Sequence, residues 1–171
     1  MMNAPSARQK RGFTLVEMLV AIAVLAVLLA LAAPSFTNAS LPSKLRSVAN
    51  SLVGAAQLAR SEAIKRDAVV TLCVSADGAT CGAGNWSQGW IVTTGGGNPP
   101  LQSVQAAPTG FRVTPAGGAV ALTFQPSGVG ATTETFTICR STPTVGSQER
   151  SVSVSAIGRP SVSTTTNGVC P

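Results

Sequence analysis

The chain has 171 residues, enough for one domain of ordinary size, and 44% of them are hydrophobic whereas only 11% are charged. The mean hydropathy of +0.32 indicates that some segment is far more apolar than a globular average. Histidine is absent, which excludes Ser-His-Asp and Cys-His catalysis and histidine-containing zinc sites. The net charge of +6 is only a weak signal for nucleic acid, because part of it is clustered at the N-terminus and the rest is scattered.

A basic head leads into a long apolar stretch at the N-terminus. Arg8, Lys10 and Arg11 precede residues 13–33, and the polar members of that stretch are Thr14 and Glu17. About 20 apolar residues are enough for a helix to cross the hydrocarbon core of a bilayer. The positive-inside rule keeps the basic head in the cytoplasm. We therefore expect a single membrane span, with the N-terminus in the cytoplasm and the rest of the chain on the other side of the membrane.

A cleaved secretory signal peptide is the alternative interpretation of this segment. Ala30-Leu31-Ala32 is similar to a small-residue cleavage site, and the basic head suits such a signal. However, the apolar stretch is longer than the roughly 7 to 15 residues of a signal peptide, and it contains a carboxylate. The sequence therefore favours a segment that stays on the protein.

Glu17 is the unusual residue of the apolar stretch, because an acid at the centre of a membrane helix costs roughly 2.5 to 3.5 kcal/mol. One interpretation is a carboxylate near the end of the span that reaches the interface. The other needs a cation at the same depth. Cleavage after Gly12 would supply it, because the new amino group of Phe13 would be available to Glu17 of a neighbouring copy. Glu17 is then a candidate assembly residue.

The run Arg11-Gly12-Phe13-Thr14-Leu15-Val16-Glu17 resembles the cleavage and methylation motif of type IV pilins and type II secretion pseudopilins. The resemblance implies that residues 1–12 are a leader removed by a prepilin peptidase. It also implies that Phe13 becomes the N-methylated first residue, and that Pro34 corresponds to the proline that kinks such helices. Residues 13–33 would be the transmembrane and assembly helix in the bacterial inner membrane. The N-terminus would lie in the cytoplasm and the C-terminal domain in the periplasm.

Residues 34–66 are expected to form an amphipathic helix packed on a globular domain. Apolar residues recur there at spacings of three and four, which is typical of one buried helix face. They are Leu45, Val48, Leu52, Ala55 or Ala56, Ala59 and Ala63. Pro34 and Pro42 each lack a backbone donor and are expected to bend or interrupt the helix, with the continuous packed part at about 43–66.

Residues 67–171 have the composition of short strands joined by turns, with many β-branched, small polar, Gly and Pro residues. Val152 and Val154 alternate with serines, as in a half-buried strand, and Ser161 to Thr166 is expected to be a loosely ordered tail. We expect strands at 69–74, 90–94, 111–114, 120–125, 135–140, 151–155 and 160–163.

The resemblance extends over nearly the whole chain. The segments that carry it include Trp86-Ser87-Gln88-Gly89-Trp90, Leu122-Thr123-Phe124-Gln125-Pro126 and Thr135-Phe136-Thr137-Ile138-Cys139. In this order and spacing they are similar to the GspH, FimT and FimU family of minor pilins and pseudopilins. The resemblance implies an α+β fold in which a long N-terminal helix packs on small antiparallel sheets.

All four cysteines, Cys73, Cys81, Cys139 and Cys170, fall in the expected periplasmic domain, where disulfides form. Three pairings are possible. We favour Cys73 with Cys81, which closes a short loop, and Cys139 with Cys170, which fixes the C-terminal tail. Free thiols are the alternative, and a four-cysteine zinc site is disfavoured because there is no CxxC pair.

The sequence bears on three classes of function. A structural subunit of a type IV pilus or a type II secretion pseudopilus, which joins the filament and helps initiate it, accounts for most of the residues. Its expected partners are other pilins or pseudopilins, the prepilin peptidase and the inner membrane. The alternative is a filament-tip subunit that binds DNA for uptake through Arg140, Arg150 and Arg159. The family's Gly-Arg-x-Arg motif, however, reads Gly158-Arg159-Pro160-Ser161 here and lacks its second arginine.

An enzyme is the third class. The chain has no histidine, and no pair of carboxylates at a catalytic spacing stands out in the sequence. We therefore expect no catalytic residues, no cofactor and no metal site.

Overall fold

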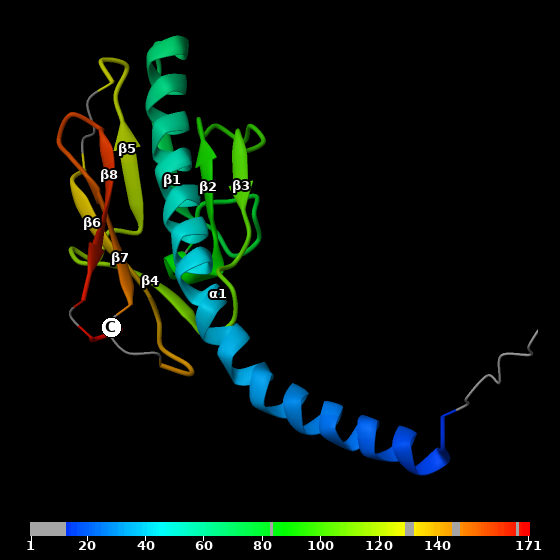
Figure 1. Cartoon of the computed structure of the whole chain (residues 1–171). Helices are drawn as coiled ribbons and strands as arrows, with labels where there is room; N and C mark the ends of the chain where they lie inside the picture. Colours follow the sequence, from blue (N-terminus) through cyan, green and yellow to red (C-terminus); the bar gives the residue numbers. More distant parts are fainter. Residues whose placement is uncertain (1–12, 83, 129–131, 145–147, 167) are drawn as a thin grey trace, which may run out of the picture. The chain divides into compact units, whose positions relative to one another are not determined.

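The computed structural model describes residues 13–82, 84–128, 132–144, 148–166 and 168–171, and the side chains of residues 31–39 lie outside this description. The chain divides into two units, residues 1–40 and 41–171. Helix α1, Leu15–Arg66, belongs to both units, whereas every strand belongs to the second (Figure 1).

Helix α1 has a defined stop signal at its C-terminal end. Asp67 adopts a left-handed conformation with φ of 49°. The Asp67 N–H donates to the Ile64 carbonyl, and the Ala68 N–H donates to the Ala63 carbonyl at 3.2 Å. These two bonds form a Schellman motif, in which aspartate stands where glycine is usual. The helix therefore stops before β1, Val70–Val74.

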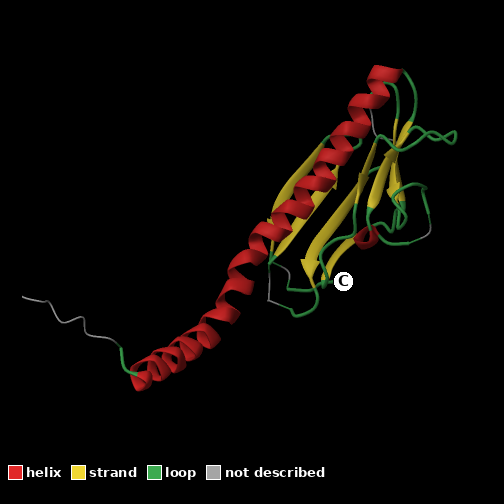
Figure 2. Cartoon of the chain, turned by 90° about the vertical axis from the view of Figure 1, so that its right-hand side faces the viewer, coloured by secondary structure: helices red, strands yellow, loops and turns green. Residues whose placement is uncertain are grey.

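In the second unit α1 buries one face, as its periodicity predicts. The side chains on this face come from positions three or four apart, and all are buried: Leu41, Leu45, Val48, Ala49, Leu52, Ala55, Ala56, Ala59 and Ala63. The alanines near the C-terminal end leave room for close approach of the strands. Figure 2 shows this half of α1 running along the strands.

The helix does not break at its prolines. The helix is continuous through Pro34 and Pro42. Of the two expected effects, a bend or an interruption, the interruption is therefore wrong. A proline removes a single backbone donor. Next to Pro42, Leu41 is buried in the core, and Leu45 is buried one turn later. Burial of these side chains offsets the lost hydrogen bond.

The strands of the described residues form two antiparallel sheets. One sheet has the order β3-β2-β1-β5, with β2 at Trp90–Thr93, β3 at Gln102–Val104 and β5 at Ala121–Phe124. The other has the order β4-β6-β7-β8, with β4 at Phe111–Pro115, β6 at Glu134–Arg140, β7 at Glu149–Val154 and β8 at Pro160–Thr165. The expected α+β architecture, a long helix packed on antiparallel sheets, is confirmed.

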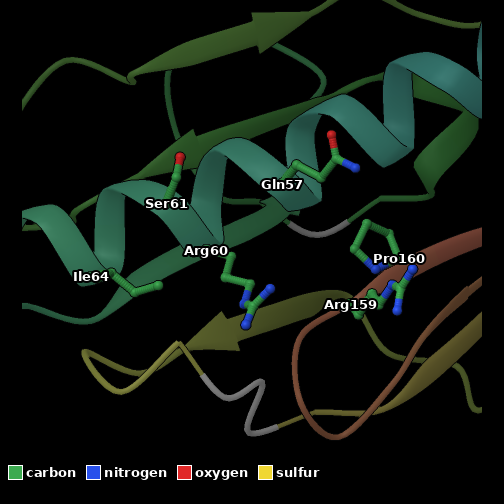
Figure 3. A pocket seen from close by; sticks show the side chains of 6 residues that line it. All are labelled: Gln57, Arg60, Ser61, Ile64, Arg159 and Pro160. Carbon is green, nitrogen blue, oxygen red and sulfur yellow. The ribbon is translucent and has the colours of Figure 1, made fainter.

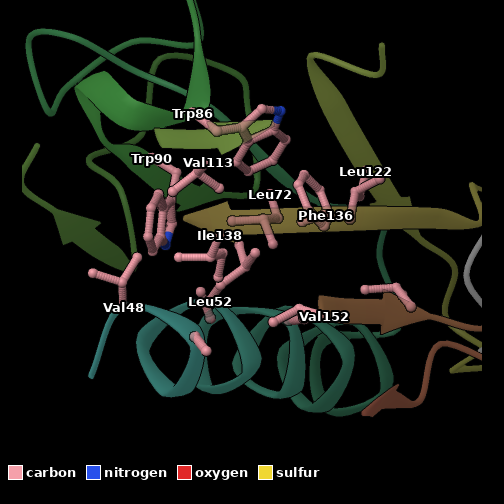
Figure 4. Packing of buried hydrophobic residues seen from close by; sticks show 14 of the residues in the cluster. Val48, Leu52, Leu72, Trp86, Trp90, Val113, Leu122, Phe136, Ile138 and Val152 are labelled. Atoms are coloured by element: carbon pink, nitrogen blue, oxygen red, sulfur yellow. The ribbon is translucent and has the colours of Figure 1, made fainter. Parts of the chain in front are cut away.

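An aromatic cluster joins the two sheets (Figure 4). Trp86 lies on the short 3-10 helix η1, Trp86–Gln88, and its ring contacts Phe136 edge-on with centroids 4.8 Å apart. The Trp86 indole N–H donates to the Ala119 carbonyl at 2.7 Å. Ser87 of η1 accepts a hydrogen bond from the Val113 N–H of β4 at 2.9 Å. The Trp-Ser-Gln segment therefore connects one sheet to the other.

The structure corrects two expectations about the strands. Strand β3 and helix η1 were not predicted, because Gln102–Val104 is short and partly polar and gains its structure by pairing with β2. The segment from Ser161 to Thr166 was expected to be loosely ordered, yet β8 continues to Thr165. Every β8 residue from Pro160 to Thr165 is in register with a residue of β7, so pairing provides the order that composition does not.

Candidate functional site

The N-terminal part of α1 carries most of the residues that the sequence singles out. Gly12 and the basic residues Arg8, Lys10 and Arg11 lie outside the described residues. Phe13 directly precedes the helix and is 77% exposed. Thr14 is the last residue before the helix, which places Glu17 in its first turn. The predicted cleavage position therefore lies just upstream of the helix start.

Thr14 and Glu17 cap this helix reciprocally. The Glu17 backbone N–H donates to Thr14 Oγ1 at 3.2 Å, and the Thr14 backbone N–H donates to Glu17 Oε2 at 3.5 Å. This is a capping box, which satisfies two backbone donors at a helix start. The sequence interpretation missed the role of Thr14, although the pattern Thr-x-x-Glu before an apolar run is its signature.

The helix that follows Glu17 exposes apolar side chains on all sides. From Phe13 to Ala30 every residue is exposed, including Leu15, Met18 and Leu25. Glu17 forms no ion pair with any residue that the structure describes. Within the part of the chain whose side chains are described, no helix is both long and apolar enough to cross a membrane.

The two disulfides are the pairs that the sequence favours. Cys73 is bonded to Cys81 and Cys139 to Cys170, each with a Cα–Cα distance of 5.6 Å. The alternative of free thiols is wrong, because all four cysteines are used. The second bond attaches the end of the chain to β6. The tail is also in contact with β4, because Thr114 Oγ1 donates to the Pro171 carbonyl at 3.3 Å.

Asp77 organises the loop that the first disulfide closes. Its Oδ1 accepts hydrogen bonds from the Thr80 and Ala79 backbone N–H groups, each at 2.9 Å, and its Oδ2 accepts from Thr80 Oγ1 at 2.7 Å. The Thr80 N–H, followed by the Ala79 N–H, lowers the pKa of Asp77 well below its usual value of 3.8. The Ser75 hydroxyl adds a further donor. This carboxylate therefore has a structural role.

Glu134, at the start of β6, is buried and fixes the turn between β4 and β5. Its Oε1 accepts from the N–H groups of Gly117 and Thr135 at 2.9 and 2.8 Å, and its Oε2 accepts from the Ala119 N–H at 3.1 Å. Burial acts to raise the pKa of Glu134, but these backbone donors together outweigh it and lower the pKa below 4.5. Its oxygens are occupied by the backbone, as expected of a structural carboxylate rather than a catalytic one.

The three arginines proposed for DNA binding do not gather at one place. Arg140 ends β6 and Arg150 is the second residue of β7, at the same end of the sheet. Arg159 directly precedes β8, whose first residue pairs with Val154 at the other end of β7. From Arg150 to Val154 the strand extends about 13 Å. The register therefore separates Arg159 from the other two.

The contacts of Arg140 and Arg150 are local. Arg140 Nε donates to the Thr142 carbonyl at 3.4 Å, and Arg150 Nη1 donates to the Glu149 carbonyl at 2.8 Å. Within the described residues, neither side chain forms an ion pair. They are the solvated or locally satisfied charges of an ordinary surface.

Comparison with known proteins gives two matches to protein families. The family model described as type II transport protein GspH matches residues 48–158. The model of the prokaryotic N-terminal methylation motif matches residues 7–33. The first match covers the packed half of α1 from Val48 onward and most of the strands. The second covers the capped helix start and the apolar stretch. No curated protein sequence matches this chain significantly.

Solved structures with the same fold include a pilin and a pseudopilin. The type IV minor pilin FimU of Pseudomonas aeruginosa is similar with a TM-score of 0.58 and 24% sequence identity, over 71% of this chain and 89% of that chain. The minor pseudopilin EpsH from the type 2 secretion system of Vibrio cholerae is similar with a TM-score of 0.51 and 16% identity, over 71% of this chain and 97% of that chain. Because the GspH model matches more than half of its residues, the chain belongs to the GspH family of minor pilins and pseudopilins, which are structural proteins and not enzymes.

Proposed function

We propose that this protein is a minor subunit of a type IV pilus or a type II secretion pseudopilus, which joins the filament and helps initiate it. In this proposal a prepilin peptidase removes residues 1–12 at the cytoplasmic face, and the amino group of Phe13 is methylated. Residues 13–33 anchor the subunit in the inner membrane before assembly, and residues 67–171 lie in the periplasm.

The observation that carries the proposal is that Glu17, a carboxylate in an apolar helix, has no cationic partner among the described residues. It lies in the first turn of a helix whose side chains are exposed and apolar, within the segment that matches the methylation motif. A carboxylate in a membrane costs roughly 2.5 to 3.5 kcal/mol at the centre of the span. No described residue of the same chain supplies a cation to Glu17.

A neighbouring subunit can supply this cation. After cleavage, the new amino group of Phe13 would lie just before the helix start, at the same end of the helix as Glu17. If two such helices stack with an axial offset, the amino group of one subunit reaches Glu17 of the next. The carboxylate that is costly in a single membrane helix then favours association of helices.

DNA binding at the filament tip is the alternative function, and the structure supports it less well. Binding to the DNA backbone depends on several cations that neutralise phosphates along the duplex. Arg140 and Arg150 lie at one end of their sheet and Arg159 at the other. This placement gives no reason to prefer DNA over a structural role.

Mass spectrometry of the protein isolated from membranes tests the proposal. We expect an intact mass that corresponds to residues 13–171, with two disulfides and one added methyl group on Phe13. The same protein should co-purify with other pilins or pseudopilins after mild crosslinking. An isolated protein that retains residues 1–12 would contradict the proposal.

A further inference from the structure

A pocket of about 430 Å³ lies on the surface of the second unit, between α1 and the start of β8. Figure 3 shows the side chains of α1 on one wall and those of the β7–β8 turn on the other. The pocket combines two guanidinium groups with an amide, a hydroxyl and two apolar side chains. Its lining residues are Gln57, Arg60, Ser61, Ile64, Arg159 and Pro160.

Arg60 is held in a fixed position on one wall. Its Nε donates to the Gly128 carbonyl at 2.8 Å, which connects α1 to the end of the turn after β5. Gly128 permits this approach, because a Cβ there would lie 2.7 Å from Ile64 Cδ1 and 3.4 Å from Arg60 Nε. Within the described residues, no hydrogen bond uses the terminal nitrogens of Arg60. These nitrogens are left for a ligand.

Arg159 is held on the opposite wall through its backbone. Its N–H donates to Ser155 Oγ at 3.2 Å, and its carbonyl accepts from the Ser155 N–H at 3.1 Å. In the part of the chain that the structure describes, its guanidinium group has no hydrogen-bond or ion-pair partner. The turn therefore positions a cation at the pocket without neutralising it.

None of the acidic side chains compensates these two charges. All six Asp and Glu residues lie in the described part of the chain, and the ion pairs there join Glu62 to Lys65 and to Arg66. Two guanidinium groups that share a pocket with no acid repel each other and favour an anion between them. No acidic side chain of the chain itself forms an ion pair with either arginine.

We propose that this pocket binds the carboxylate of an acidic side chain on a neighbouring subunit of the filament, a proposal that rests on the function proposed above. Arginine binds planar carboxylates with paired N–H donors. Ile64 and Pro160 offer apolar contacts to the methylene groups of a glutamate, and the Gln57 amide offers a further N–H donor, whereas the Ser61 hydroxyl already donates to the Leu58 carbonyl at 3.0 Å. A single recess with two arginines suits one carboxylate side chain better than an extended row of phosphates.

Binding of an acidic peptide to the full chain in non-ionic detergent tests this site. The probe is a blocked triglutamate peptide, and a blocked triglutamine peptide is its uncharged control. Selective ¹⁵N labelling of arginine reports on the Nε–H groups. We expect the triglutamate peptide to shift the signals of Arg60 and Arg159, and the triglutamine peptide to shift neither.

Three variants separate the pocket from general charge. Arg60→Gln and Arg159→Gln should each weaken triglutamate binding at least tenfold. Arg112→Gln removes the same charge from an exposed position on β4 and should change binding less than twofold. Arg159 is exposed, so its replacement tests the site even if Arg60→Gln affects folding. The proposal would be overturned if all three variants lost triglutamate affinity equally, or if the wild-type protein did not bind the triglutamate peptide.

A short DNA duplex provides the competing ligand. The carboxylate proposal is wrong, and the pocket is a phosphate site, if two results are obtained together. The duplex displaces the peptide and binds more tightly than it, and DNA binding is weakened in both Arg60→Gln and Arg159→Gln. If the duplex binds without displacing the peptide, the proposal stands.

Co-purification of the same variants from cells distinguishes this proposal from the filament function. Peptide binding by the purified chain does not require assembly. If wild-type protein assembles but does not bind the peptide, the pocket proposal alone fails. If it binds the peptide but never co-purifies with other subunits, the filament function fails. With both correct, Arg60→Gln and Arg159→Gln should lower co-purification and Arg112→Gln should not.

Discussion

Thr14 and Glu17 form reciprocal hydrogen bonds at the start of α1, with the Glu17 N–H donating to Thr14 Oγ1 at 3.2 Å and the Thr14 N–H donating to Glu17 Oε2 at 3.5 Å. Glu17 therefore has a local role in the helix as well as the role proposed in assembly. Replacing Glu17 alone removes both at once. A useful test has to separate the cap from the charge.

Three substitutions achieve this separation. Thr14→Ala removes the Thr14 cap and leaves the carboxylate, at a cost to the helix of about 0.5 to 2 kcal/mol. Glu17→Gln keeps an acceptor for the Thr14 N–H but removes the charge, and Glu17→Ala removes both. We expect Glu17→Gln and Glu17→Ala to lower co-purification with other subunits strongly, while membrane insertion and cleavage remain intact. Thr14→Ala should lower co-purification little.

Quantitative crosslinking in membranes measures these effects, and intact mass checks cleavage in each variant. If Thr14→Ala and Glu17→Ala lower assembly equally, the cap explains the requirement for Glu17. If Glu17→Gln assembles normally, the charge pair with Phe13 of a neighbour is not needed.

The two disulfides are expected to stabilise the protein unequally. Cys73 and Cys81 are 8 residues apart, and Cys139 and Cys170 are 31 apart. Loop-closure entropy then predicts that the free energy of unfolding falls by about 2.5 kcal/mol without Cys73–Cys81 and by about 3.7 kcal/mol without Cys139–Cys170. The two double Cys→Ser variants, unfolded in urea in the same detergent, should therefore differ by roughly 1 kcal/mol in their free energy of unfolding.

The local consequences of the two substitutions should also differ. Without Cys73–Cys81, the loop keeps the hydrogen bonds of Asp77 to Ala79 and Thr80. Without Cys139–Cys170, the described end of the chain keeps the hydrogen bond from Thr114 Oγ1 to the Pro171 carbonyl at 3.3 Å. Hydrogen exchange should show faster exchange after Thr165 in the second variant and little change near Asp77 in the first. Similar protection of the tail in both variants would count against its attachment by the disulfide.

The parts of the fold that depend on a regular pattern could be predicted from the sequence. Leu45, Val48 and Leu52 mark the buried face of α1 by their spacing, and Val152 and Val154 mark the inward face of β7 by alternation. In both cases the pattern is present in the element itself.

The parts that depend on a distant partner could not be predicted. Strand β8 is rich in Ser and Thr, and its order comes from the register with β7 rather than from its composition. Likewise, nothing near Arg60 in the sequence indicates the Gly128 carbonyl, which lies 68 residues away. The cap formed by Thr14 was also missed, but it needs no distant partner, because its pattern is present in residues 14–17.

Glu134 gives the stability a testable dependence on pH. Its pKa is lowered in the folded protein from an ordinary value of 4.5. The stability that it contributes is therefore present above pH 4.5 and is lost as the pH falls through the lower pKa of the folded state. Glu134→Gln places an amide donor against the backbone N–H groups and should cost roughly 1 to 3 kcal/mol at neutral pH.

The difference between wild type and Glu134→Gln is the quantity to measure, because Asp77 also has a lowered pKa. We expect this difference in the free energy of unfolding to be largest near neutral pH and to shrink as the pH falls below 4.5. Asp77→Asn is the matched control and should leave the pH dependence due to Glu134 in place. A difference that does not vary with pH would show that the charge of Glu134 contributes nothing.

Gly89 is expected to be the least replaceable residue of the segment between the two tryptophans. Its φ of 116° lies in the range that L side chains rarely adopt. A Cβ at this position would lie 2.6 Å from the Val104 carbonyl oxygen and 3.1 Å from the Ser75 carbonyl oxygen. Both contacts are with backbone, so no flexible side chain can move aside to relieve them.

Gly89→Ala should therefore destabilise the protein by more than the roughly 1 to 3 kcal/mol of backbone strain alone, and it should disturb the pairing of β2 with β3. Gly54→Ala is the matched control, because a Cβ at Gly54 would meet no atom within 4 Å beyond its own stretch of helix, and alanine is favourable in a helix. Urea unfolding followed by tryptophan fluorescence reports on both variants, since Trp86 and Trp90 flank Gly89. If Gly89→Ala is as stable as wild type, Val104 and Ser75 must move readily, and η1 is not the rigid connection between the sheets that its contacts indicate.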